Sequence, residues 1–273
     1  MTDRIVLVTG ATSGIGLETA RQLAPLGARV IVGARDSEKA RAVSDGIARA
    51  GGRAETLDVD FASFESVRRA ARELVDRLPR LDVLVNNAGT AVAKRETTGD
   101  GHERTWQTNY LGHYLLTRLL LPLLEKSPSP RVVNVASEGH RQGRIDWDDL
   151  ELSRGYGGFR AYANTKLAQV LFTRELARRE PKVLTVALHP GAIGTNIWKA
   201  LPAHADALVR LILPGAPYGA RPVVRLASDP ELKLESSGRY FKRFRESTPA
   251  PAGRSDEDAA RLWLVSEEAA GLG

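Results

Sequence analysis

A tyrosine and a lysine lie four residues apart in the segment YANTK, as Tyr162 and Lys166. On a helix, side chains with this spacing lie on one face, so both could face the same bound molecule. A phenol has an ordinary pKa of about 10, and a nearby ammonium group stabilises the phenolate and lowers that pKa. The pair therefore has the chemistry to exchange a proton with a carbonyl or alcohol oxygen. A solvated helix face would show the same spacing, so the assignment depends on the surrounding motifs.

A glycine-rich loop, TGATSGIG, occupies residues 9–16. Gly10 permits a tight turn, while Gly14 and Gly16 let the backbone approach a pyrophosphate at the positive end of the following helix. A glycine-rich loop alone is weak evidence, because its glycines can be purely structural. This loop follows a strand-like run and opens a helix-like one, which is the context that dinucleotide binding requires. Its G-x-x-x-G-x-G spacing differs from the common G-x-G-x-x-G fingerprint.

Short apolar, β-branched runs alternate with longer helical patterns along the chain. Strands are expected at 4–9, 29–32, 53–57, 81–85, 131–136 and 183–188, and helices at 14–26, 37–50, 63–78, 101–126 and 160–180. This alternation predicts βαβ units with a parallel sheet, and the nearly continuous apolar strands indicate helices on both faces. Ser255 is the expected N-cap of one more helix, because acidic residues follow it. No linker interrupts the pattern, so residues 1–273 are interpreted as a single domain.

The composition excludes several classes of site. The 273 residues include no cysteine, which excludes disulfides, thiolate metal sites and cysteine nucleophiles. The net charge is +6, but the arginines and lysines are spread along the chain without a basic run. We therefore expect a basic surface and no nucleic-acid partner; a mild positive charge also favours an anionic cofactor.

The N-terminal region carries no visible targeting or anchoring segment. The first expected strand, RIVLVTG, begins at residue 4 and leaves no room for a signal peptide. The longest apolar runs are interrupted by Arg118 and Pro122 and are well short of about 20 clean apolar residues. These features predict a cytoplasmic protein without a membrane anchor.

Four motifs occur together in a fixed order: TGATSGIG, NNAG at 86–89, a serine after the fifth strand, and YANTK. With this combination the chain resembles the short-chain dehydrogenase/reductase family over essentially its whole length. The resemblance implies an α/β, single-domain Rossmann fold, in which a doubly wound parallel sheet of about seven strands has helices on both faces. It also implies a nicotinamide cofactor and a catalytic set of Asn109, Ser137, Tyr162 and Lys166.

The resemblance assigns a role to each member of this set. Tyr162 would be the general acid and base, with its pKa lowered by Lys166, which would also contact the nicotinamide ribose. The Ser137 hydroxyl would hydrogen-bond the substrate oxygen and hold it beside the phenol. Asn109 would position a water molecule in the proton path to the lysine.

The cofactor-binding residues implied by the resemblance are spread over several strand ends. They are Gly10, Ser13, Gly14, Ile15, Gly16, Arg35, Asp58, Val59, Asn86, Ala88, Gly89, Tyr162, Lys166, Ile193 and Thr195. Asp58 would hydrogen-bond the adenine beside the Val59 backbone, and Asn86, Ala88 and Gly89 would line the adenosine ribose. Ile193, through its backbone, and Thr195, through its hydroxyl, would meet the nicotinamide carboxamide.

The end of the second strand, VIVGARD, predicts NADP(H) in preference to NAD(H). An NAD site places an acidic side chain here to hydrogen-bond the ribose 2′-hydroxyl. In this family that position falls at Ala34, which can neither accept a hydrogen bond nor repel a phosphate. The next residue, Arg35, can bind a 2′-phosphate bidentately. Asp36 is assigned to the loop that leads into the following helix.

Two apolar walls predict a small-molecule substrate with a carbonyl group and a lipophilic or bulky character. One is a substrate lid at about 195–219; the other is the segment 138–159, which supplies Trp147, Tyr156 and Phe159. Phrases such as RIDWDDL and ARLWLVSEE are most similar to the branch of the family that holds retinol dehydrogenases, the WW-domain oxidoreductase and protochlorophyllide reductase. His189 is interpreted as structural, since Tyr162 already supplies the proton.

These features together predict an NADP(H)-dependent oxidoreductase that interconverts a carbonyl and an alcohol by hydride transfer. An alternative is a catalytically silent NADP-binding regulator or scaffold, although all four catalytic residues are retained. Nucleotide-sugar epimerases and dehydratases also use Tyr-x-x-x-Lys, but they carry T-G-x-x-G-x-x-G and a larger C-terminal domain. Family members often form a homodimer through the helices expected here at 101–126 and 160–180, although this branch is variable.

Overall fold

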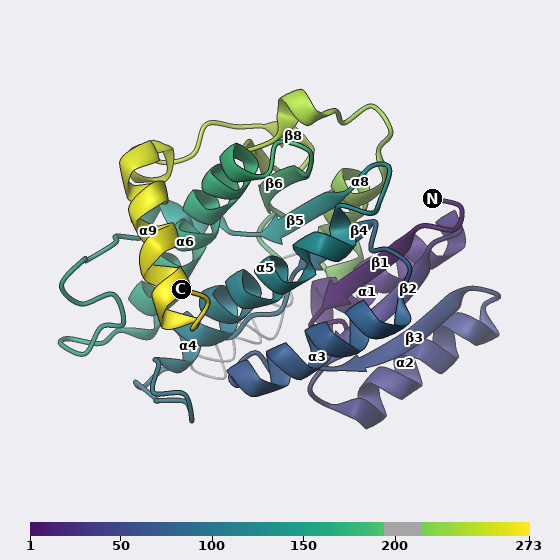
Figure 1. The fold of residues 1–273 in the computed structure, drawn as a ribbon, viewed down its shortest axis with the longest axis horizontal. Helices are drawn as coiled ribbons and strands as arrows, with labels where there is room; N and C mark the ends of the chain where they lie inside the picture. Colours follow the sequence, from purple (N-terminus) through teal and green to yellow (C-terminus); the bar gives the residue numbers. More distant parts are fainter. Residues whose placement is uncertain (194–213) are drawn as a thin grey trace.

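A computed structural model describes residues 1–193 and 214–273. Within them the strands are β1 (Ile5–Thr9), β2 (Arg29–Ala34), β3 (Arg53–Asp58), β4 (Val83–Asn86), β5 (Arg131–Val135), β6 (Leu184–His189), β7 (Tyr240–Lys242) and β8 (Arg245–Glu246). They form one sheet in the order β3-β2-β1-β4-β5-β6-β7-β8 (Figure 1). β1 to β7 pair in parallel, and β8 pairs antiparallel with β7. The predicted doubly wound parallel sheet is confirmed, with β8 as an additional edge strand.

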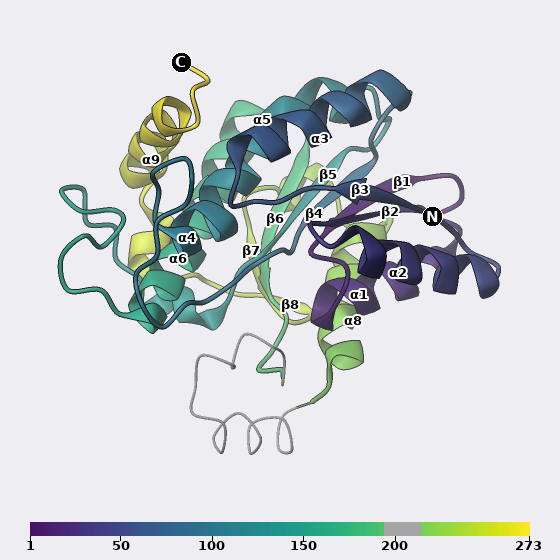
Figure 2. The same cartoon turned by 90° about the horizontal axis from the view of Figure 1, so that it is seen from below.

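Helices cover both faces of this sheet. They are α1 (Gly14–Leu23), α2 (Ser37–Arg49), α3 (Phe64–Arg77), α4 (Arg104–Trp106), the π-helical turn η2 (Gln107–Leu111), α5 (Gly112–Leu124), α6 (Gly158–Arg179), α8 (Ala216–Ser228) and α9 (Asp256–Ala269). Shorter 3₁₀ turns are η1 (Ala24–Leu26), η3 (Glu138–Gln142), η5 (Leu234–Ser236) and η6 (Pro251–Arg254). Figure 2 shows α3, α5 and α6 on one face and α1, α2 and α8 on the other. A separate apolar core fills each side.

Local capping explains where several helices begin. Asp36, Ser63 and Ser255 each precede a helix and accept a hydrogen bond from a backbone N–H of its first turn. Such caps satisfy amide groups that have no partner within the helix. The Ser255 Oγ accepts from the N–H of Asp258 at 3.0 Å, which confirms the expected start of the last helix.

The helical stretch expected at 101–126 is confirmed over 104–124, but it contains a π-helical turn that the sequence did not predict. The structure has α4, then the π-helical turn η2, then α5. Gly112 begins α5 where a Cβ atom would lie 2.9 Å from the carbonyl oxygen of Phe61, so the widened turn brings the helix against the loop that follows β3. π-helical turns of this kind are frequent at functional sites, and this one carries Asn109.

The last helix, α9, packs against α6 and the first turns of α5. The Trp263 ring stacks on Phe172 with centroids 6.0 Å apart, and the guanidinium groups of Arg118 and Arg179 each lie 4.7 Å from its centre. The Tyr110 hydroxyl and Ser266 Oγ are 2.7 Å apart. Figure 1 shows this helix, in yellow, lying across α6. α9 therefore covers part of the outer surface of both helices.

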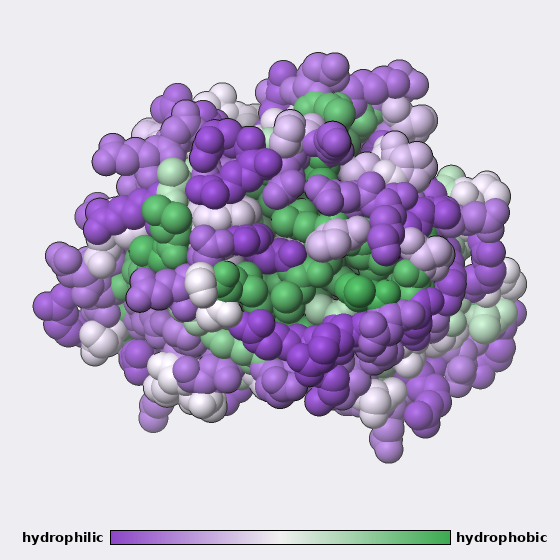
Figure 3. Space-filling view, in the orientation of Figure 1, coloured by the Kyte–Doolittle hydropathy of each residue, from purple (hydrophilic) through white to green (hydrophobic). Residues whose placement is uncertain are grey.

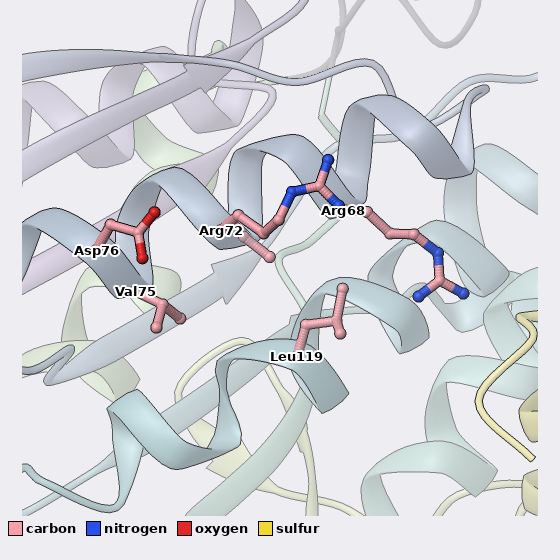
Figure 4. A pocket seen from close by; sticks show the side chains of 6 residues that line it. Arg68, Arg72, Val75, Asp76 and Leu119 are labelled. Carbon is pink, nitrogen blue, oxygen red and sulfur yellow. The ribbon is translucent and has the colours of Figure 1, made fainter.

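Apolar side chains also gather in a band over the face formed by α3 and α5 (Figure 3). A shallow pocket between these helices is lined by Arg68, Ala71, Arg72, Val75, Asp76 and Leu119 (Figure 4). In the part of the chain that the structure describes, no helix is long and apolar enough to cross a membrane.

Candidate active site

Ser137 and Tyr162 meet at the carboxyl edge of the sheet. Ser137 follows β5 and caps η3, with its Oγ accepting from the N–H of Gly139 at 3.1 Å. Tyr162 lies in the first turns of α6, close enough to the Ser137 side chain for that hydroxyl to favour the phenolate. Both side chains lie against Gly139, where a Cβ atom would be in van der Waals contact with Cε1 of Tyr162 at 3.4 Å and Oγ of Ser137 at 3.5 Å. Two residues predicted to share the substrate oxygen are thus adjacent.

Lys166 lies one turn beyond Tyr162 on α6 and is almost completely buried, at 4% exposure. Its Nζ donates to the carbonyl oxygen of Val135 at 2.8 Å and to Oε1 of Gln169 at 2.9 Å. It also lies 5.4 Å from the centre of the Tyr162 ring. Both acceptors are neutral, and burial lowers the pKa of Lys166 to about 7. The ammonium is close enough to influence the phenol, but among the described residues no carboxylate stabilises its charge.

The pKa of the Tyr162 phenol is raised, whereas the sequence predicted that Lys166 would lower it. Burial raises the pKa of Tyr162, and the nearby Ser137 hydroxyl, which favours the phenolate, offsets only part of that increase. The expectation that the neighbouring lysine sets a lowered pKa is therefore wrong for this arrangement, because desolvation of the phenolate dominates. A raised pKa keeps the phenol protonated at neutral pH, which is the state required of an acid.

Asn109 is fully buried in the π-helical turn η2. Its Oδ1 accepts from the N–H of Thr90 at 2.7 Å, and its Nδ2 donates to the carbonyl oxygen of Thr90 at 2.9 Å and to Oγ1 of Thr165 at 3.2 Å. The side chain is therefore fully used in joining η2 to the loop after β4 and to α6. Any link from Asn109 to the lysine has to go through its main-chain carbonyl.

That carbonyl accepts two hydrogen bonds. Gln169 Nε2 donates to it at 2.8 Å, and His113 Nδ1 lies 3.0 Å away. Because a carbonyl oxygen only accepts, Nδ1 of His113 must carry the proton. Its Nε2, 3.2 Å from the Thr9 hydroxyl, is then an acceptor. Burial lowers the pKa of His113 to about 3, so the ring is neutral and connects η2 to the end of β1.

The glycine-rich loop forms a cradle that fits a dinucleotide. Gly10 and Gly14 have positive φ values of 66° and 56°, which glycine adopts without strain. A Cβ atom on Gly16 would lie 2.4 Å from both the carbonyl oxygen of Gly10 and Nδ2 of Asn87. Ser13, the N-cap of α1, makes no side-chain capping bond. The open helix N-terminus is suited to a pyrophosphate.

The NNAG segment is arranged differently from the expectation. Asn86 is fully buried and donates from Nδ2 to Oγ1 of Thr117 at 3.0 Å and to Oδ1 of Asn134 at 2.9 Å. Its side chain therefore points into the interior and cannot line the adenosine ribose, which corrects that assignment. Asn87, which the sequence analysis missed, donates from Nδ2 to the carbonyl oxygen of Thr9 at 2.8 Å and ties this segment to the glycine-rich loop.

Ala88 and Gly89 lie beside the glycine-rich loop and the π-helical turn, respectively. A Cβ atom on Gly10 would lie 2.8 Å from Cα of Ala88, and a Cβ atom on Gly89 would lie 3.5 Å from Oδ1 of Asn109. These distances show that the segment crosses directly over the glycine-rich loop and then approaches the π-helical turn. The close approach to Ala88 leaves no room for a side chain at Gly10.

The end of β2 presents Arg35 to solvent next to the buried Ala34. Asp36 is turned the other way, because its Oδ1 accepts from the N–H of Lys39 at 3.0 Å and its Oδ2 pairs with Nζ of Lys39 at 2.6 Å. The assignment of Asp36 to the start of the following helix is therefore confirmed. Its carboxylate does not occupy the place that an NAD-binding acid would need.

Asp58 and Val59 lie at the neighbouring strand end. The Val59 N–H donates to the carbonyl oxygen of Ala34 at 3.0 Å, and the exposed Asp58 pairs with Nη2 of Arg69 at 2.8 Å. Arg69 was missed because it lies on α3, and only the folded chain brings it to the end of β3. It orients the carboxylate that is expected to meet the adenine.

At the nicotinamide end, Ile193 is buried against α8, where a Cβ atom on Gly219 would lie 2.7 Å from its Cγ1 and 3.2 Å from Cγ1 of Ile15. Thr195 and residues 195–213 of the expected lid lie outside the described residues. Nδ1 of His189 is buried without a hydrogen-bond partner in the described segments, and burial lowers the pKa of this histidine to about 4. The ring is therefore neutral at ordinary pH, so His189 is not present as an imidazolium acid.

Only one of the three aromatic residues expected at the second substrate wall is free to serve there. Trp147 lies under the guanidinium of Arg261, 4.2 Å from its ring centre, and so belongs to the contact with α9. The Tyr156 hydroxyl donates at 3.1 Å to the carbonyl oxygen of Val92. Phe159 is 54% exposed and precedes Tyr162 by almost one helical turn.

Comparison with known proteins agrees with this geometry. The family described as short chain dehydrogenase matches residues 4–206. Retinol dehydrogenase 13 of Homo sapiens is 38% identical over 287 residues, which cover 98% of this chain and 85% of that protein. A protein of Streptomyces sp. (strain C5) named as a daunorubicin C-13 ketoreductase is 40% identical over 270 residues, with coverage of 98% and 93%.

Solved structures show the same architecture. An uncharacterised protein from Mycobacterium paratuberculosis has a TM-score of 0.81 at 35% identity, covering 99% of this chain and 94% of that one. A short chain dehydrogenase from Escherichia coli CFT073 complexed with NADPH has a TM-score of 0.70 at 28% identity, with coverage of 90% and 98%. The chain belongs to the short chain dehydrogenase family. It is an oxidoreductase of alcohol and carbonyl groups, in a family that binds nicotinamide cofactors.

Proposed function

We propose that this protein is an NADP(H)-dependent carbonyl reductase in which Tyr162 is the general acid. The observation that carries the proposal is the meeting of Ser137, Tyr162 and Lys166 at the carboxyl edge of the sheet, close to the glycine-rich loop. A protonated phenol, a hydroxyl that can bind the substrate oxygen and a buried ammonium are the groups that carbonyl reduction needs.

The residues of the chain divide the proton chemistry between them. Ser137 donates a hydrogen bond to the substrate carbonyl and holds its oxygen beside the phenol. Tyr162 transfers its proton to that oxygen as the carbonyl carbon is reduced, and Lys166 stabilises the phenolate that remains. When bound, the reduced nicotinamide supplies the hydride. In the reverse direction the phenolate accepts the proton of an alcohol.

The preference for NADP(H) rests on the end of β2. Arg35 is exposed, has no ion-pair partner among the described residues, and follows an alanine at the position where an NAD site carries an acid. The NADPH complex of the related Escherichia coli protein is consistent with this preference.

A lipophilic carbonyl compound is the substrate class that we infer. The exposed Phe159 lies almost one turn before Tyr162 on α6 and offers an apolar surface beside the reacting group. The names of the relatives point the same way, since a retinoid and an anthracycline are both bulky and largely apolar. We expect an aldehyde or ketone of this character in preference to a small charged carbonyl compound.

A turnover assay tests the proposal. The purified protein is mixed with NADPH or NADH and a panel containing retinaldehyde, aryl ketones, an anthracycline ketone and pyruvate, and loss of reduced nicotinamide is followed by absorbance. We expect turnover of apolar members with NADPH and little with pyruvate. Binding of NADPH without turnover of any member would instead favour the catalytically silent regulator.

A further inference from the structure

Gln169 connects two parts of the site that are distant in sequence. Its side chain is 2% exposed and lies almost one turn beyond Lys166 on α6. Oε1 accepts from Nζ of Lys166 at 2.9 Å, while Nε2 donates to the carbonyl oxygen of Asn109 at 2.8 Å. An ammonium group only donates and a carbonyl only accepts, so the amide can take just this orientation. With its amide oxygen on Lys166 and its amide nitrogen on Asn109, Gln169 is well suited to hold the lysine ammonium in place.

The ammonium has few other means of stabilisation. Within the described residues Lys166 forms no ion pair with a carboxylate, and its other acceptor is the carbonyl oxygen of Val135 on β5. The titratable groups near it are Tyr162 on the same helix and His113 on α5, and both are neutral at pH 7. A buried cation without an anion depends on the dipoles around it, so each of the two acceptors matters.

We propose that Gln169 is a positioning residue, whose amide oxygen keeps Lys166 protonated and whose amide nitrogen anchors that lysine to the π-helical turn of Asn109. The inference rests on the proposed function in one respect, because it takes the charge on Lys166 to assist proton transfer by Tyr162. Gln169 itself touches neither the substrate nor the reacting atoms.

Substitutions of similar size separate this role from simple packing. Gln169→Leu removes the acceptor, so the neutral amine is favoured and the pKa of Lys166 falls below its value of about 7. Gln169→Glu places a carboxylate at the same distance, so the charged form is favoured and the pKa rises. The loss of a hydrogen bond to a charged group corresponds to a shift of about one pKa unit or more.

The test is an NMR titration of the full-length protein labelled with ¹³C and ¹⁵N in its lysines. The Lys166 resonance is assigned by its loss in Lys166→Met, and no cofactor or substrate is needed. We expect the pKa of Lys166 to be lowest in Gln169→Leu, intermediate in wild type and highest in Gln169→Glu. Gln22→Leu, on α1 across the sheet, is the matched control and should leave the value unchanged. Equal values in wild type and both Gln169 variants would overturn the inference.

A second measurement addresses the catalytic part. In the ketone assay the pH dependence of kcat should move in Gln169→Leu, while KM for NADPH stays within a few fold. Shifted lysine titration with an unchanged pH–rate profile would overturn the role in proton transfer. Absence of turnover in wild type, with the lysine shifts present, would count against the proposed function alone. Thermal unfolding of each variant establishes that it is folded under the conditions used.

Discussion

Tyr162 experiences two opposing influences, and their balance defines its chemistry. Burial raises its pKa, whereas Ser137, and Lys166 when charged, favour the phenolate. The phenol is therefore protonated in the free protein. Ser137 and Lys166 stabilise the phenolate that forms as the proton is transferred. The sequence motif identified the residue, but a pairwise argument about two charges could not include the cost of desolvation.

The first prediction concerns that proton. Tyr162→Phe should lower kcat for carbonyl reduction by roughly 10²–10⁴-fold, because general acid catalysis contributes on this scale. NADPH affinity, measured by quenching of protein fluorescence, should stay within a few fold, since the ring and its packing are retained. Wild-type activity in the variant would remove Tyr162 from the mechanism.

The second prediction concerns Arg35. Arg35→Ala should raise KM for NADPH by about ten- to a hundredfold, since one hydrogen bond to a charged group is lost. KM for NADH should change little, because NADH has no 2′-phosphate. Adding Ala34→Asp should then favour NADH. Steady-state kinetics with both cofactors measure these effects, and a higher kcat/KM for NADH in the unmodified protein would contradict the assignment.

At the scale of elements, sequence periodicity predicted the strands and helices but not the π-helical turn η2. Apolar β-branched runs located six of the strands within a few residues, because buried parallel strands require them. The π-helical turn leaves no such signature, since residues 107–111 contain neither proline nor glycine. Likewise, the inward direction of Asn86 depends on Thr117 and Asn134, which only the folded sheet brings near.

The third prediction tests how Asn109 holds η2 in place. Asn109→Ala leaves the half-buried N–H and carbonyl oxygen of Thr90 without their partner. A fully buried unsatisfied polar group costs about 1–3 kcal/mol, so we expect a loss of about 1–3 kcal/mol in the free energy of unfolding by urea. Thr165→Val removes a single weaker contact and should cost less. Equal stability of Asn109→Ala and wild type would show that water replaces the side chain.

The fourth prediction concerns pH. His102 Nδ1 lies 2.6 Å from Oε1 of Glu151, and hydrogen bonding to this carboxylate raises the pKa of the histidine. The stabilisation is therefore fully present below the unfolded pKa of about 6.5 and is lost as pH rises through the higher folded value. His102→Gln should destabilise the protein more at pH 5.5 than at pH 9. Chemical unfolding at both pH values measures the difference; a pH-independent effect would exclude the ion pair as its source.

For the whole molecule, the position of α9 bears on self-association. A homodimer through α5 and α6 was an expectation from the family, but α9 lies over part of that surface and buries Trp263 there. The part of α6 that packs against α9 is therefore not available to a second copy while α9 stays in this place.

The fifth prediction follows from this cover. The protein should be a monomer at micromolar concentration by light scattering coupled to size-exclusion chromatography. Trp263→Ala should lower the free energy of unfolding by about 3–5 kcal/mol and promote self-association, because it uncovers the apolar side of α6. Leu264→Ala is a suitable control, since that side chain on the same helix is exposed. A wild-type dimer in which cross-linking joins α5 and α6 would contradict the prediction.

The two edge strands of the sheet bear on how readily the protein aggregates at high concentration. An unpaired strand edge is a template for another chain, yet neither end here offers a long apolar one. β8 has two residues, Arg245 and Glu246, both exposed, and the outer strand β3 carries Glu55, which pairs with Arg29 and Arg77. One edge is therefore very short and the other carries charged side chains, and both features resist strand addition. Replacing these charged residues with neutral ones should therefore make concentrated protein aggregate sooner on warming. The rate of carbonyl reduction should stay the same, because the substitutions are at the edges of the sheet.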